Sequence, residues 1–351
     1  MRTAVLLLNF GEPEHATLEE VVPYLERIFG LNARLDPRAA GPEARARSRA
    51  LAEARAPSLI EEYESIGGSP LHVQATAHAD GVAAELARRG HDVVLLQGMQ
   101  FTAPLIPDAV AAARAAGADR VVALPVYPLC GPTTTVAALA EVADEMRKLG
   151  WDAPLLEMGG WHRHPDYVRL RADAIRETVS VAGTDLADPR TRLVFSAHGT
   201  PLKYIEDGSR YEEYVRDFCA LLAAELGVME YVIGYQNHSN RPGIQWTQPD
   251  IAQVIEHVDA DRVVVDPVSF MHEQSETLAE LDHELREQAE ARGLAFHRVM
   301  IPHDSPAFIR LLADLLEPLI RAEPEPAGLR ACLCRGVPGA YCLNGAREGA
   351  A

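Results

Sequence analysis

Short runs of aliphatic and β-branched residues recur along the chain and alternate with stretches whose apolar positions lie three and four residues apart. The runs predict strands at 4–8, 93–97, 120–124, 193–195, 231–233 and 262–265. The intervening stretches predict helices that include 18–29, 75–88, 106–116, 136–149, 211–226 and 305–321. Strands that alternate with helices form βαβ units, so we expect an α/β fold with mainly parallel sheets.

The two halves of the chain resemble each other at three places, in the same order. LLLNFGEP, ending at Pro13, resembles LVFSAHGTP, ending at Pro201, and LLQGMQ around Gly98 resembles VIGYQN around Gly234. ADRVVALPV similarly resembles ADRVVVDPV, which starts at Ala260. Ordered repeats of this kind indicate a duplicated unit. We therefore predict two similar domains, at 1–150 and 151–322, followed by a C-terminal tail at 323–351.

The interval between the matched prolines is longer in the first half (13 to 125, 112 residues) than in the second (201 to 267, 66 residues), and part of the excess lies at about 30–56. This segment is rich in alanine, arginine and proline and lacks strand character, so we expect it to form a lip over a binding site. Ligands of open parallel sheets bind beyond the carboxyl ends of the strands. The loops NFGEP, GMQF, PVYPL, SAHGTP, YQNHSNRPG and PVSFMHEQSE should therefore face one cleft between the domains.

The net charge, the lack of long apolar runs and the absence of several motifs disfavour a number of functional classes. The 351 residues carry a formal charge of −18, which repels nucleic acid and anionic lipid surfaces and attracts divalent cations. No run approaches the ~18 apolar residues of a membrane span, and polar residues come too early for a signal peptide, so we expect a cytoplasmic protein. GxGxxG, GxxxxGK(S/T), HExxH and GxSxG are absent, which disfavours dinucleotide, P-loop, zincin and serine-hydrolase chemistry.

His198 is the strongest candidate for chemistry, because it follows an apolar strand directly and has small neighbours, Ala197 and Gly199. An imidazole accepts protons near neutral pH and binds borderline metal ions when neutral. After the strand at 262–265, Glu276, Glu280 and Glu284 recur at intervals of four, which places them on one face of a predicted helix. Such a row is either a solvated acidic face or a path for cations and protons toward the cleft.

These motifs together resemble the ferrochelatase family over nearly the full length of the chain. SAHGTP is similar to the family's SAH-x-x-P, YESIGGSPL is similar to its Y-x-x-I-G-G-x-SPL stretch, and PVSFMHEQSETLAELDHE is similar to its carboxylate segment, with Glu276 on the catalytic glutamate. The resemblance implies a chelatase-like fold of two Rossmann-like domains with a porphyrin cleft between them. It also implies an enzyme of heme biosynthesis, a lyase that inserts ferrous iron into a porphyrin.

By resemblance, His198 and Glu276 face each other across the macrocycle and serve both as the catalytic pair and as ligands of the substrate iron. Metallation must remove two pyrrole N–H protons, which a neutral His198 can accept while Glu276 and the acidic row carry charge. The resemblance also implies that Phe10, Tyr63 and Ser69 contact the porphyrin. Phe10 stands where many bacterial relatives have tyrosine, and Glu62 stands where some have arginine.

Five cysteines in so long a chain do not form a disulfide framework, yet Cys332, Cys334 and Cys342 lie close together near its end. Several ferrochelatases hold a 2Fe-2S cluster with such a tail. Four thiolates are the usual ligand set, so the fourth ligand would be Cys130, Cys219 or a group other than cysteine. A disordered tail with reduced thiols is the equal alternative.

Two other interpretations stay open. A cobalt or sirohydrochlorin chelatase also has paired α/β halves and strand-end histidines, although YESIGGSPL argues against it. A noncatalytic carrier of tetrapyrrole or metal would use the same cleft without turnover, but binding alone does not require both His198 and Glu276. The oligomeric state is not determined by the sequence.

The substrate is either coproporphyrin III, with four carboxylates, or protoporphyrin IX, with two. Guanidinium groups suit carboxylates, and the lip is rich in them, so coproporphyrin is favoured. Good solubility of the lip explains the same residues almost as well. They are Arg34, Arg38, Arg45, Arg47, Arg49 and Arg55.

Overall fold

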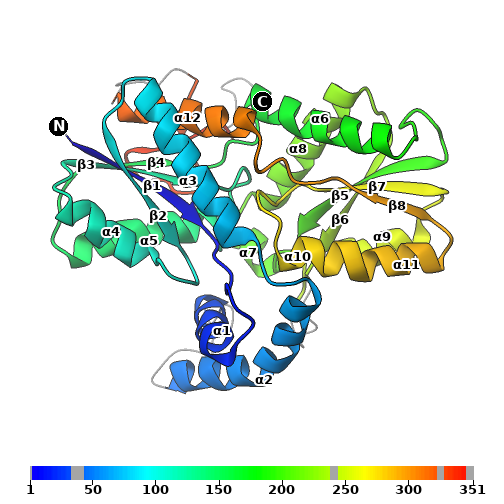
Figure 1. Ribbon diagram of the computed structural model, residues 1–351, viewed down its shortest axis with the longest axis horizontal. Coiled ribbons are helices and arrows are strands. Elements are labelled where there is room, and N and C mark those ends of the chain that lie inside the picture. The colour runs from blue at the N-terminus through cyan, green and yellow to red at the C-terminus, as the bar shows by residue number, and fades with distance from the viewer. Residues whose placement is uncertain (1, 33–42, 238–243, 322–327, 345–351) are drawn as a thin grey trace.

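The computed structural model describes residues 2–32, 43–237, 244–321 and 328–344 (Figure 1). Its strands form a six-stranded sheet, in the order β2-β1-β3-β4-β10-β9, and a four-stranded sheet, in the order β6-β5-β7-β8. The first sheet contains β1 (Thr3–Asn9), β2 (Val93–Met99), β3 (Arg120–Pro125), β4 (Leu155–Met158), β9 (Arg330–Ala331) and β10 (Ala340–Cys342). The second contains β5 (Thr191–His198), β6 (Tyr231–Gln236), β7 (Arg262–Pro267) and β8 (Ala295–Arg298).

The segments that resemble each other in the two halves of the sequence occupy equivalent positions in the two sheets, with the same pairing between neighbouring strands. In the first sheet, Leu8 on the central strand β1 is opposite Gly98 and Pro125. In the second sheet, Ser196 on the central strand β5 is opposite Gly234 and Pro267. Both sets of neighbours are parallel, as βαβ connections require. The prediction of an α/β fold with two similar parallel units is therefore confirmed.

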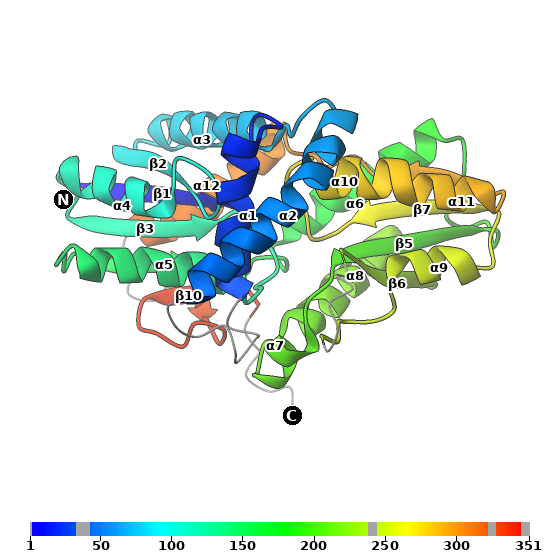
Figure 2. The same cartoon turned by 90° about the horizontal axis from the view of Figure 1, so that it is seen from below.

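Helices cover both faces of each sheet (Figures 1 and 2). Strands buried on both faces become apolar throughout, and every residue of β1 is buried. In the first unit the covering helices are α4 (Ile106–Ala115) and α5 (Thr135–Lys148) on one face, with α3 (Leu71–Arg88) and α12 (Pro306–Ile320) on the other. In the second they are α6 (Pro165–Val181) and α8 (Tyr211–Leu226), opposite α9 (Ile251–His257) and α11 (Arg286–Ala291).

The chain does not divide between the sheets at one point. Strand β4 lies after residue 150, the predicted boundary, but it pairs with β3 in the first sheet. Helix α12, at the end of the predicted second domain, packs against α3 of the first. In the described part of the tail, Ala340 is paired with Glu157 and thereby extends the first sheet. The C-terminal segment therefore returns to the N-terminal unit.

The predicted lip, at about 30–56, overlaps the end of one helix and the first part of the next, and we call these two helices the lip helices. Helix α1 (Leu18–Asn32) packs against α2 (Glu43–Ser65), and the pair lies beside both sheets (Figure 1). Residues 33–42 of the predicted lip lie outside the described residues. The buried positions of α2 are mostly small and follow a helical period, which allows the two helices to approach closely. They are Ser48, Ala52, Ala56, Leu59 and Tyr63.

The sequence predicted a regular α-helix after β7, but the helix in the structure is irregular. A short helix α10 (Ser275–Leu278) leads into a π-helical turn (Glu280–Leu285) and then into α11. The Glu284 N–H donates to the carbonyl of Ala279, five residues back. A π turn holds more residues than an α turn, but Glu280 still lies close enough to Glu276 for the same Gln236 amide to contact both residues. Glu280 is half-buried and Glu284 is exposed.

Candidate active site

The structure brings His198 and Glu276 together at the carboxyl end of the second sheet. His198 is the last residue of β5, and Glu276 lies in the first turn of α10. The imidazole Nε2 is 3.1 Å from Glu276 Oε1. The exposed fractions of the two side chains are 39% and 14%. Position at a strand end therefore gives the imidazole both a carboxylate partner and access from outside.

Backbone and hydroxyl groups fix His198 in this orientation. Its Nδ1 donates to the carbonyl of Gly199 at 2.6 Å, which turns Nε2 toward Glu276. Its backbone N–H donates to Ser269 Oγ at 3.1 Å. The Tyr211 hydroxyl donates to the His198 carbonyl at 3.1 Å and lies 2.9 Å from the same Ser269 oxygen. A histidine whose second nitrogen is already bonded presents the first in a defined direction.

Amide side chains hold Glu276 from the other side. Gln274 donates to Oε2 at 2.9 Å, and Asn237 donates to Oε1. Asn237 has φ +58°, a left-handed conformation that asparagine tolerates, directly after β6 ends at Gln236. Gln236 donates to the Glu276 carbonyl at 2.8 Å. The ends of β5 and β6 therefore both contribute to the position of this carboxylate.

The two groups form an ion pair. Burial by itself lowers the pKa of the His198 imidazole, but the charge of Glu276 and its hydrogen bond outweigh burial and raise that pKa to about 9. Burial raises the pKa of the Glu276 carboxyl, and the charge of His198 reverses this effect and holds it below its ordinary value. The charge of Glu276 therefore favours the imidazolium form of His198, whereas the sequence analysis expected a neutral ring.

Further carboxyl groups lie near the pair. Gln236 donates to Glu280 Oε2 at 3.1 Å, and burial followed by the charge of Glu276 raises the pKa of Glu280 well above its ordinary value. Burial and the charges of Glu284 and Glu276 raise the pKa of Glu62 of α2, while its ion pair with Arg55 at 3.4 Å opposes this effect. The acidic groups therefore come from both the α10 region and the lip.

Tyr63 and Ser69, predicted to contact the porphyrin, both bind Glu12. The Tyr63 hydroxyl donates to Glu12 at 3.1 Å, and Ser69 Oγ donates to the other oxygen of the same carboxyl group. Tyr63 is buried. Phe10, the third predicted contact, is half-buried and packs on Phe101, with ring centroids 4.6 Å apart.

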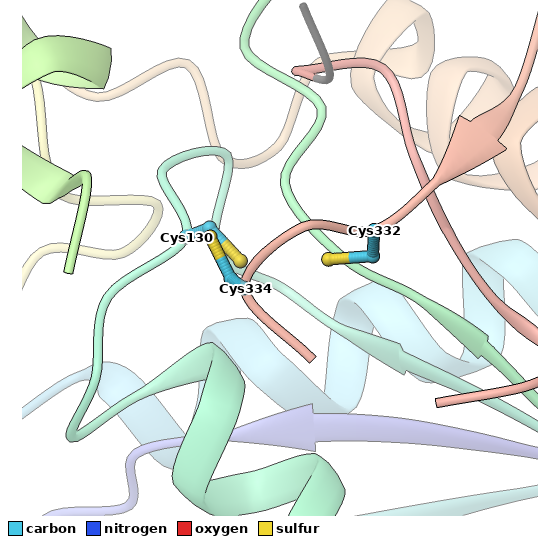
Figure 3. A group of neighbouring side chains, drawn as sticks. All are labelled: Cys130, Cys332 and Cys334. Carbon is cyan, nitrogen blue, oxygen red and sulfur yellow. The ribbon is translucent and has the colours of Figure 1, made fainter. Parts of the chain in front are cut away.

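The cysteines of the tail meet an internal cysteine. Sγ atoms of Cys130, Cys332 and Cys334 all lie within 4.8 Å of one another (Figure 3). Hydrogen bonds from Cys130, Cys334 and Cys342 lower the pKa of the Cys332 thiol. Cys130 follows β3 in the PVYPLCGP loop, and Cys334 also lies 3.3 Å from the Tyr214 hydroxyl. Cys219 is buried in the apolar core and is not part of this group of thiols.

A cavity of about 550 Å³ opens between the two lip helices. Its lining includes the predicted Arg45 and also Arg27, which the sequence analysis did not single out. Arg49 is paired with Glu53 at 2.7 Å, and Arg55 is paired with Glu62. The predicted Arg34 and Arg38 lie outside the described residues.

Several residues of the site were not found from the sequence. Gln236, Asn237 and Gln274 hold Glu276, while Ser269 and Tyr211 hold the backbone of His198. Four of them, all except Tyr211, lie in the strand-end loops expected to face the cleft, and that placement was the available signal. Their amide and hydroxyl groups do not titrate near pH 7, so residue type alone did not distinguish them.

The family model described as Ferrochelatase matches residues 2–319. Coproporphyrin III ferrochelatase of Mycolicibacterium vanbaalenii is 31% identical over 349 residues, which cover 97% of each chain. Ferrochelatases of Synechococcus sp. (strain CC9311) and Aquifex aeolicus are 34% and 31% identical. Each covers 90% of this chain, and the alignments span 82% and 99% of their own lengths.

Solved structures of chelatases have the same fold. SirB from Bacillus subtilis with Fe3+ superposes with a TM-score of 0.53 at 12% identity, over 90% of this chain and 96% of that one. CbiX, the terminal enzyme for biosynthesis of siroheme in denitrifying bacteria, gives 0.51 at 16% identity, over 90% and 98%. The chelatase fold expected from the sequence is therefore confirmed. In the described parts of the chain, every helix is too short or too polar to cross a membrane.

Proposed function

The chain belongs to the ferrochelatase family, and from this premise we propose that it inserts Fe2+ into coproporphyrin III, with His198 and Glu276 exchanging protons for metal. Members of the family are enzymes that insert metal into a porphyrin, so a noncatalytic carrier is the weaker account. Likeness to the siroheme enzymes is a likeness of fold alone. The observation that carries the proposal is the 3.1 Å contact between an exposed strand-end imidazole and a held carboxylate.

Charge balance explains why the reaction suits such a pair. One Fe2+ enters the porphyrin and two pyrrole protons leave, so the total charge in the cleft is unchanged. The pair holds one proton at neutral pH, because the pKa of His198 is about 9. An approaching cation opposes that proton electrostatically. Fe2+ near Glu276 therefore favours transfer of the His198 proton to water at the exposed side of the ring, which leaves Nε2 free to accept one proton from a pyrrole nitrogen.

The second proton needs another acceptor. Glu276 is the carboxylate that contacts His198. The amide of Gln236 donates to the backbone carbonyl of Glu276 and also to the side chain of Glu280, so the two residues are held close together. Burial and the charge of Glu276 raise the pKa of Glu280 well above its ordinary value, which makes it a better proton acceptor, and its half-buried side chain can pass the proton to water. In this proposal the acidic groups of α10 and the π turn pass protons outward while iron moves inward.

The lip supports coproporphyrin III as the substrate. Arg27 and Arg45 line the cavity between α1 and α2, and guanidinium groups bind carboxylates in a fixed, two-pronged geometry. Coproporphyrin has two more carboxylates than protoporphyrin to meet them. Two relatives of about 30% identity carry the name coproporphyrin III ferrochelatase, which agrees with this choice.

An anaerobic assay with ferrous iron and each porphyrin in turn tests the substrate. We expect coproporphyrin III to be metallated with the higher kcat/KM. Arg45→Ala should reduce kcat/KM for coproporphyrin more than for protoporphyrin. Arg49→Ala is the matched control, because Arg49 is already paired with Glu53. Equal or better use of protoporphyrin by the parent would refute the choice of substrate without refuting iron insertion.

The same proposal includes a 2Fe-2S cluster bound by Cys130, Cys332, Cys334 and Cys342. Three buried or half-buried thiols already lie within 4.8 Å of one another, and the fourth contributes to the lowered pKa of Cys332, so the donor set fits the four-thiolate pattern. When bound, a cluster of this type holds or passes a single electron. The hydroxyl of Tyr214 lies 3.3 Å from the Sγ atom of Cys334.

Iron and acid-labile sulfide analysis of anaerobically purified protein, together with its visible spectrum, tests the cluster. We expect iron and sulfide in equal amounts and a charge-transfer absorption in the parent. Cys130→Ser should lose both, and Cys219→Ser should keep both, because Cys219 is not among the thiols whose Sγ atoms lie within 4.8 Å of one another. A parent protein without iron or sulfide under these conditions would refute the cluster.

We also place the enzyme in the cytoplasm. All five cysteines are free thiols, and both thiols and Fe2+ persist in a reducing compartment. Cell fractionation with antibody detection tests this: recovery in the cytosolic fraction is expected, and recovery with the membranes or the periplasm would contradict it.

A further inference from the structure

Glu12 is a buried carboxyl group with four hydrogen-bond donors. It lies in the loop after β1 and is 1% exposed. Its Oε1 accepts from the Tyr63 hydroxyl at 3.1 Å and from Ser275 Oγ at 2.6 Å. Its Oε2 accepts from Ser69 Oγ and from the Ser275 N–H at 3.2 Å. Each oxygen therefore has two donors, which satisfies the carboxylate fully.

The donors come from three separate segments. Tyr63 is on the lip helix α2, Ser69 precedes α3, and Ser275 begins α10. The residue after Ser275 is Glu276. One side chain of the first unit therefore connects the lip to the turn that carries the carboxylate of the candidate active site, and its bond to the Ser275 N–H satisfies one of the free donors at the start of that helix.

The chemistry of this cup is specific for a carboxylate. Its donors are three hydroxyls and one N–H, and no cation is among the contacts of Glu12 in the described residues. Ser69 Oγ also accepts from the Leu71 N–H at 3.2 Å, which leaves its own hydrogen for Glu12. Buried hydroxyls without an acceptor would be left unsatisfied, so removal of the carboxylate leaves a polar cavity.

We propose that Glu12 is a positioning residue for Glu276, an internal carboxylate that occupies the cup formed by Tyr63, Ser69 and Ser275. Tyr63 and Ser69 then affect catalysis through Glu12 and not by direct contact with substrate carboxylates. The inference rests on the proposed function, because it assumes that Glu276 acts with His198. In the second unit the matching position is Thr200, which has no carboxyl group.

Chemical rescue tests the proposal. Glu12→Ala should lower kcat for iron insertion by roughly 100-fold, since a small displacement of a catalytic group has effects of this size, with a smaller effect on KM for the porphyrin. Acetate or propionate at constant ionic strength should restore kcat saturably, and chloride should not. Glu12→Gln should retain more activity than the alanine variant, because the hydroxyls can turn to accept from its amide.

A double-mutant cycle separates positioning from direct binding and from loss of fold. Tyr63→Phe should lower kcat in the parent and have no further effect in Glu12→Ala. A direct contact would instead raise KM for the porphyrin equally in both backgrounds, and that result would overturn the proposal. Thermal melts identify a variant that fails to fold, in which case Glu12→Gln and Tyr63→Phe decide the question.

Glu14→Ala is the control, because Glu14 is an exposed carboxylate two residues along the same loop. Unchanged kcat in Glu12→Ala, or a loss that neither small carboxylates nor glutamine reduces, would overturn the inference. The activity of His198→Ala distinguishes a failure of the role proposed for Glu12 from a failure of the proposed function. If that variant is inactive while Glu12→Ala is fully active, only the role of Glu12 fails; if both are fully active, the proposed function fails.

Discussion

The ends of β1 and β5 occupy equivalent places in the two sheets and carry different chemistry. Leu8 and Ser196 have matching partners on both sides, so Phe10 and His198, each two residues farther on, are structural counterparts. Phe10 packs among aromatic rings, with Phe101 at 4.6 Å and Tyr24 at 6.3 Å. His198 contacts the carboxylate of Glu276. Duplication therefore produced two strand ends, and one of them acquired an ionisable pair.

The loops after the third strand of each unit explain this difference. After β7 the chain runs into α10 and supplies Glu276 beside His198. After β3 the corresponding loop carries Cys130 toward the tail cysteines (Figure 3). Phe10 consequently has no carboxylate partner among the described residues. The comparison indicates that the fold determines where a side chain is presented, while the next loop determines which reaction it can perform.

The strongest test of the asymmetry is removal of the imidazole. His198→Ala should lower the rate of iron insertion by about 10²–10⁴-fold, the usual contribution of a positioned acid–base group. Porphyrin binding, followed by absorbance or fluorescence, should stay within a few-fold of the parent. Ser209→Ala, a polar residue in the turn before α8, serves as a control. An active His198→Ala enzyme would mean that the strand end of β5 is not special.

A second asymmetry lies in the cores. Asp266 on β7 forms a fully buried ion pair with Arg171, where the first unit has Leu124 in the equivalent register. Asp266→Ala should lower the free energy of unfolding by about 3–5 kcal/mol, because Arg171 stays buried without its partner. The double variant Asp266→Leu with Arg171→Met imitates the apolar first unit and should regain most of the loss. Urea unfolding measures both; equal losses in the single and double variants would contradict this view of the pair.

The smallest expected effect concerns Phe10. Its ring is half-buried, and full burial of a phenylalanine contributes about 1.5–3 kcal/mol, so loss of its contact with a bound macrocycle should cost about 1 kcal/mol. Phe10→Ala should therefore raise KM for the porphyrin roughly fivefold and leave kcat nearly unchanged. Phe10→Tyr retains the ring and should keep the parental KM. A collapse of kcat in Phe10→Ala would show that the first strand end takes part in the chemistry.

The six longer strands could be predicted from the sequence, because their short apolar runs are rich in β-branched residues and are separated by stretches of helical periodicity. Strands β4 and β8, which have four residues each and include polar positions, were missed. In β4 the carboxylate of Glu157 is buried because Arg335 of the tail binds it at 2.7 Å. A partner 178 residues away is not visible in a local pattern.

The candidate site was predictable where a residue type has few other roles. His198 was identified from its position at a strand end, and Glu276 was singled out from the acidic row by the resemblance to the ferrochelatase family; the structure places the two in contact. The π turn was not foreseen, because the four-residue spacing of the glutamates matches an ordinary α-helix. Of the candidates for the fourth ligand, which were Cys130, Cys219 and a group other than cysteine, Cys130 has its Sγ within 4.8 Å of those of Cys332 and Cys334. Only the fold brings this internal residue to the tail.

The central claim is that His198 and Glu276 act as one ion pair, and an NMR titration of histidine ring signals tests it most directly. The His198 signal, assigned by its absence in His198→Ala, should titrate near pH 9 in the parent. In Glu276→Gln the carboxylate that raises this pKa is gone and burial remains, so the midpoint should fall to about 6.5 or below. A midpoint near 6.5 in both proteins would contradict the account, because it would show that the two groups do not interact.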